Sequence, residues 1–307
     1  MLDESAKGVY VICPTPFAED GALDLASAER MTDAYLAAGA SGLTILGIMG
    51  EAPKLDTAEA LTFVRTVLKR TAGRVPVLVG VSAPGFASMR ALARGAVDVG
   101  AAGVMIAPPA GLRGDDAVVT YMAQASEAIG DIPYVLQDYP QATGVFMSAE
   151  MIRRMAADPK LKMLKAEDWP GLDKIGAIRR MEREGAIKRI AILGGNGGQF
   201  LPFEIERGAD GIMTGYAYPE MLVRVCALLA KGRRAEAHDL FDAHLPLIRY
   251  ELQPGLGLAV RKYVLKKRGI LASAALRKPG PKLSAETISE VDWMLARLER
   301  REAALAA

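Results

Sequence analysis

Lys165 is the residue whose type and position most directly suggest covalent chemistry. It stands near the end of a short apolar segment that a turn signal follows, a pattern typical of a buried β-strand. A buried ammonium group is costly unless it is paired or loses its proton, and a neutral amine is the nucleophile that Schiff-base formation requires. Two interpretations of Lys165 therefore stay open, a catalytic amine and a structural ion pair with a neighbouring carboxylate.

Glu167 is the carboxylate that the strand pattern places beside this lysine. Side chains of a strand return to the same face every two residues, so Glu167 and Lys165 point the same way. We expect Glu167 either to move a proton next to the lysine or to form a salt bridge at the rim of the sheet.

Two further polar residues follow neighbouring strand candidates. Gln137 shares a face with Tyr139, and its amide would orient a substrate hydroxyl or a water, since an amide does not titrate. Asn196 lies in a glycine-rich stretch over residues 194–198. It either binds the far end of a substrate or serves as a turn residue.

These residues depend on eight short apolar segments that alternate with amphipathic stretches of helical periodicity. The strand candidates are Val9–Cys13, Leu43–Leu46, Val77–Val81, Val104–Ala107, Tyr134–Gln137, Met163–Ala166, Ile190–Leu193 and Gly211–Thr214. The helix candidates between them include Leu25–Ala38, Ala58–Thr71, Ala87–Val99 and Ala117–Ile129.

Eight such units within residues 1–232 predict an α/β fold, a (β/α)8 TIM barrel, whose active site lies at the C-terminal ends of the strands. An open doubly wound sheet is the alternative, but the first strand is not followed by a glycine-rich dinucleotide fingerprint. Beyond residue 232 the pattern is helical, at Ala235–Leu252, Leu256–Lys267 and Ala285–Leu305. We expect residues 233–307 to form a C-terminal helical appendage packed on the barrel, in one structural unit.

The composition is that of an ordinary globular protein. The 307 residues carry a formal net charge of +2, which suggests neither a nucleic-acid nor an anionic-membrane partner. The basic stretch at Lys262, Lys266, Lys267 and Arg268 is interpreted as a solvated helix face. Two cysteines indicate no disulfide framework and no metal cluster. Without a signal-peptide pattern or an apolar run that could cross a bilayer, we expect a cytoplasmic protein.

Four motifs in this order resemble those of the dihydrodipicolinate synthase and N-acetylneuraminate lyase family of Schiff-base-forming class I aldolases and dehydratases. They are Cys13-Pro14-Thr15-Pro16-Phe17, Gly47-Ile48-Met49-Gly50-Glu51, Pro140 with Thr143-Gly144, and Leu164-Lys165. The resemblance covers nearly the whole chain. It implies a lyase that needs no cofactor or metal and that forms a homo-oligomer, a dimer or a tetramer.

The resemblance also implies a chemistry and a binding site. An imine between Lys165 and a 2-keto acid, such as pyruvate, would acidify the adjacent carbon and permit aldol cleavage, condensation or dehydration. Backbone N–H groups around Ile48 and Met49 would hold the keto-acid carboxylate, with Gly47 and Gly50 allowing its close approach. The remaining residues expected to bind substrate are Thr15, Asn196 and Met213.

The departures from the family pattern bear on the substrate. Ile48 and Met49 replace hydroxyl residues, Gln137 replaces a catalytic tyrosine, and Ala142 replaces an arginine. The loop over residues 107–111 lacks the tyrosine that relatives lend to a neighbouring subunit. These departures argue against 4-hydroxy-tetrahydrodipicolinate synthase proper, and the chain looks more like the branch that dehydrates 2-keto-3-deoxy sugar acids.

Three other readings remain. A phosphosugar enzyme would use the glycine-rich stretch over residues 194–198 as a phosphate cradle, although that stretch holds no lysine or arginine. A metal-dependent aldolase would need ligands that His238 and His244, six residues apart, are poorly spaced to provide. A non-catalytic barrel would bind a sugar acid as a sensor.

Overall fold

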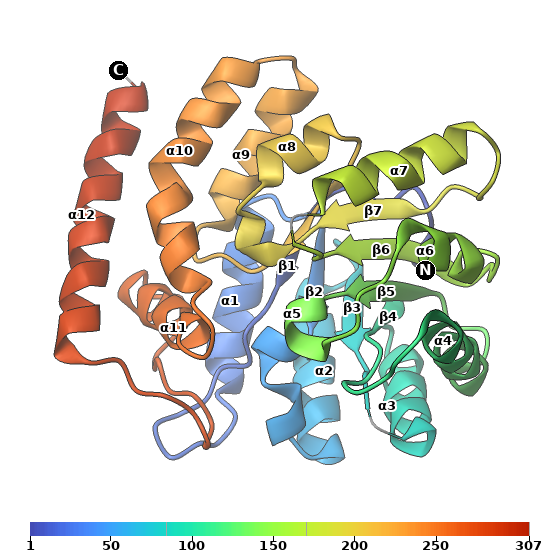
Figure 1. Ribbon diagram of the computed structural model, residues 1–307. Coiled ribbons are helices and arrows are strands. Elements are labelled where there is room, and N and C mark those ends of the chain that lie inside the picture. The colour runs from blue at the N-terminus through green and yellow to red at the C-terminus, as the bar shows by residue number, and fades with distance from the viewer. Residues whose placement is uncertain (84, 170, 307) are drawn as a thin grey trace.

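The computed structural model describes residues 1–83, 85–169 and 171–306. Within these residues, eight parallel strands form a closed barrel in which each strand pairs with the next and β8 pairs with β1 (Figure 1). The strands are β1 (Gly8–Ile12), β2 (Gly42–Ile45), β3 (Val77–Gly80), β4 (Gly103–Ile106), β5 (Tyr134–Asp138), β6 (Leu161–Ala166), β7 (Ala191–Gly194) and β8 (Gly211–Thr214). The expected (β/α)8 barrel is confirmed.

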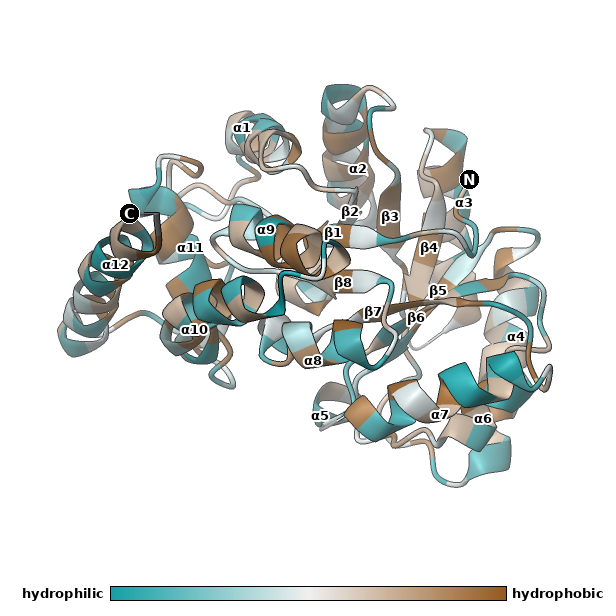
Figure 2. Cartoon of the chain, turned by 90° about the horizontal axis from the view of Figure 1, so that it is seen from above, coloured by the Kyte–Doolittle hydropathy of each residue, from teal (hydrophilic) through white to brown (hydrophobic). Residues whose placement is uncertain are grey.

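Helices connect the strands and cover the outside of the barrel (Figure 1). They are α1 (Leu25–Ala37), α2 (Thr57–Thr71), α3 (Phe86–Asp98), α4 (Asp115–Ile129), α5 (Pro140–Thr143), α6 (Ala149–Met155), α7 (Leu172–Arg183), α8 (Leu201–Glu206) and α9 (Pro219–Ala230). Three short 3-10 turns also lie at the strand ends: η1 (Ile48–Gly50), η2 (Ala52–Lys54) and η3 (Asn196–Gly198). In the view of Figure 2 the strands are largely apolar, whereas α6 and α7 carry hydrophilic segments, as helices between a core and water do.

Three longer helices follow the barrel. Helix α10 (Arg234–Glu251) packs beside α9, and α12 (Ala285–Ala306) packs against α10 at the edge of the molecule (Figure 1). Helix α11 (Gly257–Lys267) and the segment after it contact the end of the barrel, where the Arg277 guanidinium binds the Glu59 carboxylate of α2 at 2.6 Å. These contacts tie the C-terminal helices to the face where the strands end.

The interpretation of the basic stretch on α11 as a solvated face is wrong for Lys262, whereas Lys266 and Lys267 are exposed. Lys262 is 0% exposed, and its ammonium donates to Glu51 at 2.6 Å and to the Ala275 carbonyl at 2.9 Å. Lys267 is paired with Asp292 at the surface. Charge spacing alone did not show that one lysine of the stretch turns inward.

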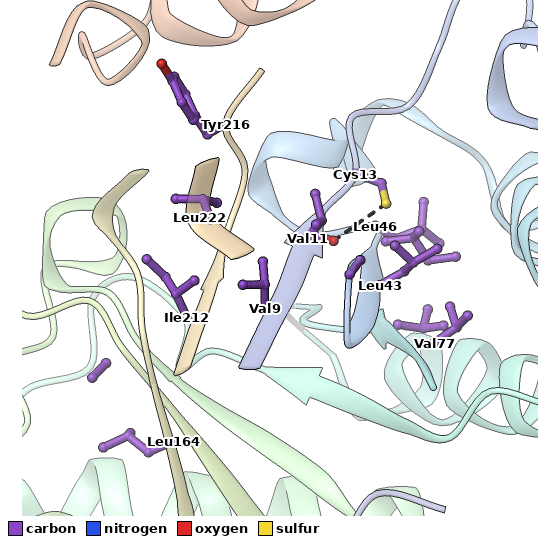
Figure 3. Close-up of a cluster of buried hydrophobic side chains, with 14 of the residues drawn as sticks. Val9, Val11, Cys13, Leu43, Leu46, Val77, Leu164, Ile212, Tyr216 and Leu222 are labelled. Atoms are coloured by element: carbon purple, nitrogen blue, oxygen red, sulfur yellow. Dashed lines mark hydrogen bonds between the residues drawn. The ribbon is translucent and has the colours of Figure 1, made fainter. Parts of the chain in front are cut away.

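Side-chain alternation along the strands gives the barrel two apolar layers. Tyr10 and Ile12 of β1 point into the barrel, while Val9 and Val11 point toward the helices. The outer layer contains Val9, Val11, Ile212 and Leu222, which lie together in Figure 3. The inner layer comprises Leu2, Tyr10, Ile12, Leu78, Met105, Val135, Met163, Ala191, Leu193 and Met213. The lower barrel is therefore a packed core, which leaves only its upper end free for chemistry.

The eighth strand has its expected bounds, and the boundaries of the other strands differ from the expected ones by one or two residues. Leu46, expected to end the second strand, has a φ of 55°, so β2 ends at Ile45 and the chain turns sharply into η1. Ile190 lies before β7, and α5 and α8 have too few residues for a periodic pattern. None of the described helices combines the length and the apolar character needed to cross a bilayer.

Candidate active site

Three side chains at the ends of β5 and β6 form a connected polar group at the C-terminal end of the barrel. The Nζ of Lys165, on β6, lies 2.8 Å from Oε2 of Glu167. The amide Nε2 of Gln137, on β5, donates to the same carboxylate oxygen at 2.7 Å. Lys165 and Glu167 are 5% and 6% exposed, so this group is almost fully shielded from bulk water.

Strand alternation places these side chains inside the barrel. Met163 belongs to the inner layer and Leu164 to the outer one, so Lys165 and Glu167 continue the inner face of β6. On β5 the order is the same: Gln137 points inward and Asp138 outward, where Lys174 of α7 binds it at 2.7 Å. Burial raises the pKa of Asp138 to about 6, and Lys174 opposes that rise.

A small cavity of about 40 Å³ lies above this group. It is lined by Ile12, Gly47, Ile48, Met49, Met105, Gln137, Tyr139, Lys165, Glu167, Asn196, Gly197, Thr214, Gly215, Leu252 and Arg261. A second cavity of about 280 Å³ shares Gly47, Ile48, Met105 and Gln137 with the first. The remaining wall of the second cavity includes Ser82, Ala107, Pro108, Pro109, Ala110, Ala142 and Thr143.

The loop after β2 is held rigidly from outside the cavity. Glu51 has a φ of 53°, and its carboxylate accepts from Lys54 at 2.8 Å and from Lys262 at 2.6 Å. The Thr15 hydroxyl donates to the Gly50 carbonyl at 2.5 Å. These bonds fix the turn that carries Ile48 and Met49 on the cavity wall.

Three residues expected to bind substrate do not line this cavity. Thr15 is fully buried, and its hydroxyl is already bound to the carbonyl of Gly50. Gly50 supports the turn through its N–H bond to the Gly47 carbonyl at 2.9 Å. Met213 packs in the inner layer of the barrel and is not part of the cavity wall. Thr15 and Gly50 therefore support the cavity wall from behind. The motif over residues 47–51 contains both residues that line the cavity and residues that only support them.

Asn196 does line the cavity, and it is also a turn residue. Its φ is 50°, its side-chain amide donates to the Asp168 carbonyl at 3.3 Å, and its backbone N–H points to Oε1 of Glu167 at 3.5 Å. The glycines beside it leave no room for a side chain. A Cβ at Gly195 would overlap the side chain of Glu167, and one at Gly194 would overlap Glu204. The stretch is therefore glycine-rich because two carboxyl side chains pack directly on its backbone.

Tyr139 and Arg261 line the cavity but were not among the site residues expected from the sequence. Tyr139 lies above Gln137 on the same face, and burial raises the pKa of its hydroxyl, with the Glu167 carboxylate acting in the same direction. Arg261 reaches the cavity from α11, far along the chain. A strand-end search finds Tyr139 by its period, but it has no signal for an arginine in a helix beyond the barrel.

The arrangement suits proton transfer to and from an amine. A carboxylate at 2.8 Å is within reach to accept the ammonium proton of Lys165, which leaves the neutral amine that attacks a carbonyl. Gln137 holds the carboxylate in place and does not compete for the proton. Among the described residues, no group of three or more His, Cys, Asp or Glu side chains is arranged to hold a metal ion.

The two histidines have structural partners instead. The His244 Nδ1 lies 2.9 Å from the Tyr216 hydroxyl, and its Nε2 lies 3.2 Å from Glu302. His238 contacts Glu206 at 3.2 Å. Both histidines stay in the helical layer formed by α10, away from the cavity that holds Lys165.

The chain is similar to proteins of a known family. A model described as the Dihydrodipicolinate synthetase family matches residues 5–298. An L-2-keto-3-deoxyarabonate dehydratase of Azospirillum brasilense is 32% identical over 297 residues, 95% of this chain and 94% of the relative. A 4-hydroxy-tetrahydrodipicolinate synthase of Thiobacillus denitrificans is 29% identical and covers 79% of this chain and 81% of its own.

The fold comparison agrees with the sequence comparison. A crystal structure described as dihydrodipicolinate synthase from Rhodopseudomonas palustris has a TM-score of 0.95 and 56% identity, and covers 96% of this chain and 99% of its own. The motifs, the barrel and the family match all agree. The chain therefore belongs to the dihydrodipicolinate synthetase family, and it is a lyase that acts on a 2-keto acid through a Schiff base.

Proposed function

We propose that this enzyme dehydrates a 2-keto-3-deoxy sugar acid, with Lys165 as the imine-forming residue. The observation that carries the proposal is the buried group of Lys165, Glu167 and Gln137, in which a single carboxylate contacts both the amine and the amide. The similarity to a 2-keto-3-deoxyarabonate dehydratase over 95% of the chain supports the same substrate class.

The steps follow from the positions of these groups. Glu167 accepts the proton of Lys165, and the neutral amine attacks the C2 ketone. Glu167 then returns that proton, so that the carbinolamine loses its hydroxyl as water to give the protonated imine and Glu167 is a carboxylate again. The imine draws electrons from C3, and Glu167 removes a C3 proton to give an enamine. The enamine then expels the C4 hydroxyl, which takes the proton from the Glu167 carboxyl and leaves as water. Hydrolysis of the unsaturated imine returns the amine.

Gln137 argues against a reaction that needs a tyrosine proton relay at this position. An amide at this position orients the carboxylate and a substrate oxygen by hydrogen bonds, and it cannot carry a proton through the cycle. Elimination of a β-hydroxyl needs only one group that takes and returns a proton near C3 and C4. Glu167, on the inner face beside the amine, meets that need alone.

The second candidate is condensation of pyruvate with an aldehyde, as in a 4-hydroxy-tetrahydrodipicolinate synthase. The name of the 56% identical structure favours it. The wall of the larger cavity argues against it, since Ala107, Pro108, Ala110 and Ala142 offer no cationic group for a second carboxylate there. We therefore rank dehydration first.

The volumes of the two cavities determine where the substrate can bind. A cavity of about 40 Å³ has room for about one water molecule, so a five-carbon acid must also occupy the adjoining cavity of about 280 Å³. Gln137 stands between the two. We expect its side chain to shift when the substrate binds.

Borohydride trapping tests the proposal. The protein is incubated with pyruvate and sodium borohydride, and the mass of the Lys165 peptide is measured in the wild type and in Lys165→Met. The wild type is expected to gain a reduced pyruvate adduct on Lys165, and the variant none. A panel of 2-keto-3-deoxy acids followed by mass spectrometry should then show loss of one water from at least one of them. Binding of keto acids without any adduct would identify a sensor instead.

We also propose that the enzyme is a homo-oligomer. Large apolar side chains are exposed on the described surface, including Phe146 at 73% and Ile48 at 48%. A second copy of the chain would cover such side chains. Light scattering after size exclusion tests this, and a mass of one chain would refute it.

A further inference from the structure

Arg261 is a buried cation in the wall of the cavity that holds Lys165. It is 2% exposed, although it comes from α11, outside the barrel. Its Nε donates to Oε2 of Glu251 at 3.0 Å. Its Nη1 is fully buried and has no hydrogen-bond partner among the described residues. A buried guanidinium nitrogen without an acceptor is expensive, so its position at a cavity indicates a place for an acceptor that binds there.

The surroundings hold the guanidinium in this position. Gly215 lines the same cavity, and any Cβ there would overlap Nη1 and lie 2.8 Å from the carbonyl oxygen of Ile12. The glycine thus leaves the space above the ends of β8 and β1 to the arginine. Behind it, Glu251 is 2% exposed and uses only one of its oxygens on Arg261. Burial raises the pKa of Glu251 to about 7, and Arg261 opposes that rise.

The charges inside the cavity favour an anionic acceptor. The wall contains two cationic side chains, Lys165 and Arg261, and one carboxylate, Glu167, which the lysine already binds. The turn over residues 48–49 presents apolar side chains to the same space and leaves only backbone N–H groups as donors there. Arg261 is already paired with Glu251 through Nε, so a bound carboxylate would supply the acceptor that its Nη1 lacks.

We propose that Arg261 binds the carboxylate of the 2-keto acid that forms the imine with Lys165. This inference rests on the proposed function, because it needs a keto acid at Lys165. Arg261 is then a binding residue, supplied by the helix after the barrel, which adds a charged donor where the β2 turn has no side-chain hydroxyl.

The test compares pyruvate with methyl pyruvate, which has the same ketone and no charge. Half-saturating concentrations for borohydride trapping on Lys165 are measured in the wild type, in Arg261→Met, and in Lys267→Met as a control. Lys267 lies on the same helix but is exposed and bound to Asp292. Arg261→Met should raise the pyruvate value about 10- to 100-fold and change the methyl pyruvate value less than about threefold. Lys267→Met should change neither.

The outcomes distinguish a failure of the proposed function from a failure of the role assigned to Arg261. If the wild type traps neither ligand, the proposed function fails. If the wild type traps both and Arg261→Met shifts them equally or shifts neither, only the role of Arg261 is refuted. Should Arg261→Met not fold, as judged by near-UV circular dichroism, Arg261→Lys is measured with the same two ligands. A shift confined to pyruvate supports the assignment in that variant too, and its absence overturns the assignment.

Discussion

The Nζ of Lys165 and the Oε2 of Glu167 lie 2.8 Å apart inside the barrel, on residues that are neighbours along one face of β6. Both interpretations that the sequence left open for Lys165 meet in this contact. It is an ion pair in geometry, and it is also the contact that a proton needs to leave the amine. The cavity beside it and the Gln137 amide on the same oxygen are the observations on which the proposed catalytic role of this pair rests.

Glu167→Gln should therefore reduce turnover without unfolding the protein. The amide keeps the shape but cannot take the ammonium proton or a C3 proton, so kcat should fall roughly 10²- to 10⁴-fold. Steady-state rates with the keto acid that the wild type dehydrates give the measurement. Glu150→Gln is the control, since Glu150 is an exposed partner of Arg153. Equal kcat in wild type and Glu167→Gln would remove Glu167 from the mechanism.

Gly195→Ala should impair the same carboxylate from the other side. A Cβ at position 195 would overlap Cγ of Glu167, so the carboxylate must move away from Lys165. We expect a loss of kcat of about tenfold or more, because small misplacements of reacting groups are costly. Gly176→Ala is a matched change, since the nearest atom to a Cβ there is 3.8 Å away on a flexible arginine. A fully active Gly195→Ala would mean that the position of Glu167 is not critical.

The sequence predicted the arrangements that follow from the strand period and missed the contacts between residues that are far apart in the chain. Strand period alone put Lys165 and Glu167 on one face and opposed Gln137 to Asp138, and the structure has both arrangements. The same reasoning could not tell which residues of the strand-end motifs line the cavity and which only support the residues that do. Thr15 looked like a substrate ligand, yet its hydroxyl is used by the Gly50 carbonyl, a contact between two loops.

Residues of α11 show the same limit more strongly. Lys262 and Arg261 stand in a helix whose sequence looks like a charged surface, and both are buried against the end of the barrel. Their partners, Glu51 and Glu251, lie 211 and 10 residues away in the chain. No helical or strand period relates a residue to such a partner, because the contact depends on how the last helices pack on the barrel.

Lys262→Met should destabilise the fold and loosen the β2 turn. Removing the ammonium leaves the buried Glu51 with Lys54 and the Arg277 N–H as its remaining donors, so the loss is that of one hydrogen bond to a buried charged group, about 1.5–3 kcal/mol. Urea unfolding followed by circular dichroism measures the change. Lys267→Met breaks a surface pair with Asp292 and should cost less than about 1 kcal/mol. Similar losses in both variants would contradict the structural role assigned to Lys262.

Glu204→Gln should change how stability depends on pH. Glu204 is fully buried under the β7 loop, and burial raises the pKa of its carboxyl to about 8 from an ordinary value of 4.5, against a hydrogen bond from the Gly195 N–H that lowers it. The folded protein therefore keeps a proton that the unfolded chain loses above pH 4.5.

The sign follows from that difference in bound protons. The stability that the protonated Glu204 provides is complete below about pH 4.5 and is lost as pH rises toward about 8, by roughly 1.4 kcal/mol for each pH unit. Glutamine does not titrate, so Glu204→Gln lacks this loss, and all other groups cancel when the two proteins are compared. Thermal midpoints are measured at about pH 5, 6, 7 and 8, which span this window. They should show the Tm of the wild type falling relative to that of the variant. A constant difference between the two Tm values would mean that the Glu204 carboxyl is ionised in the folded protein throughout this range.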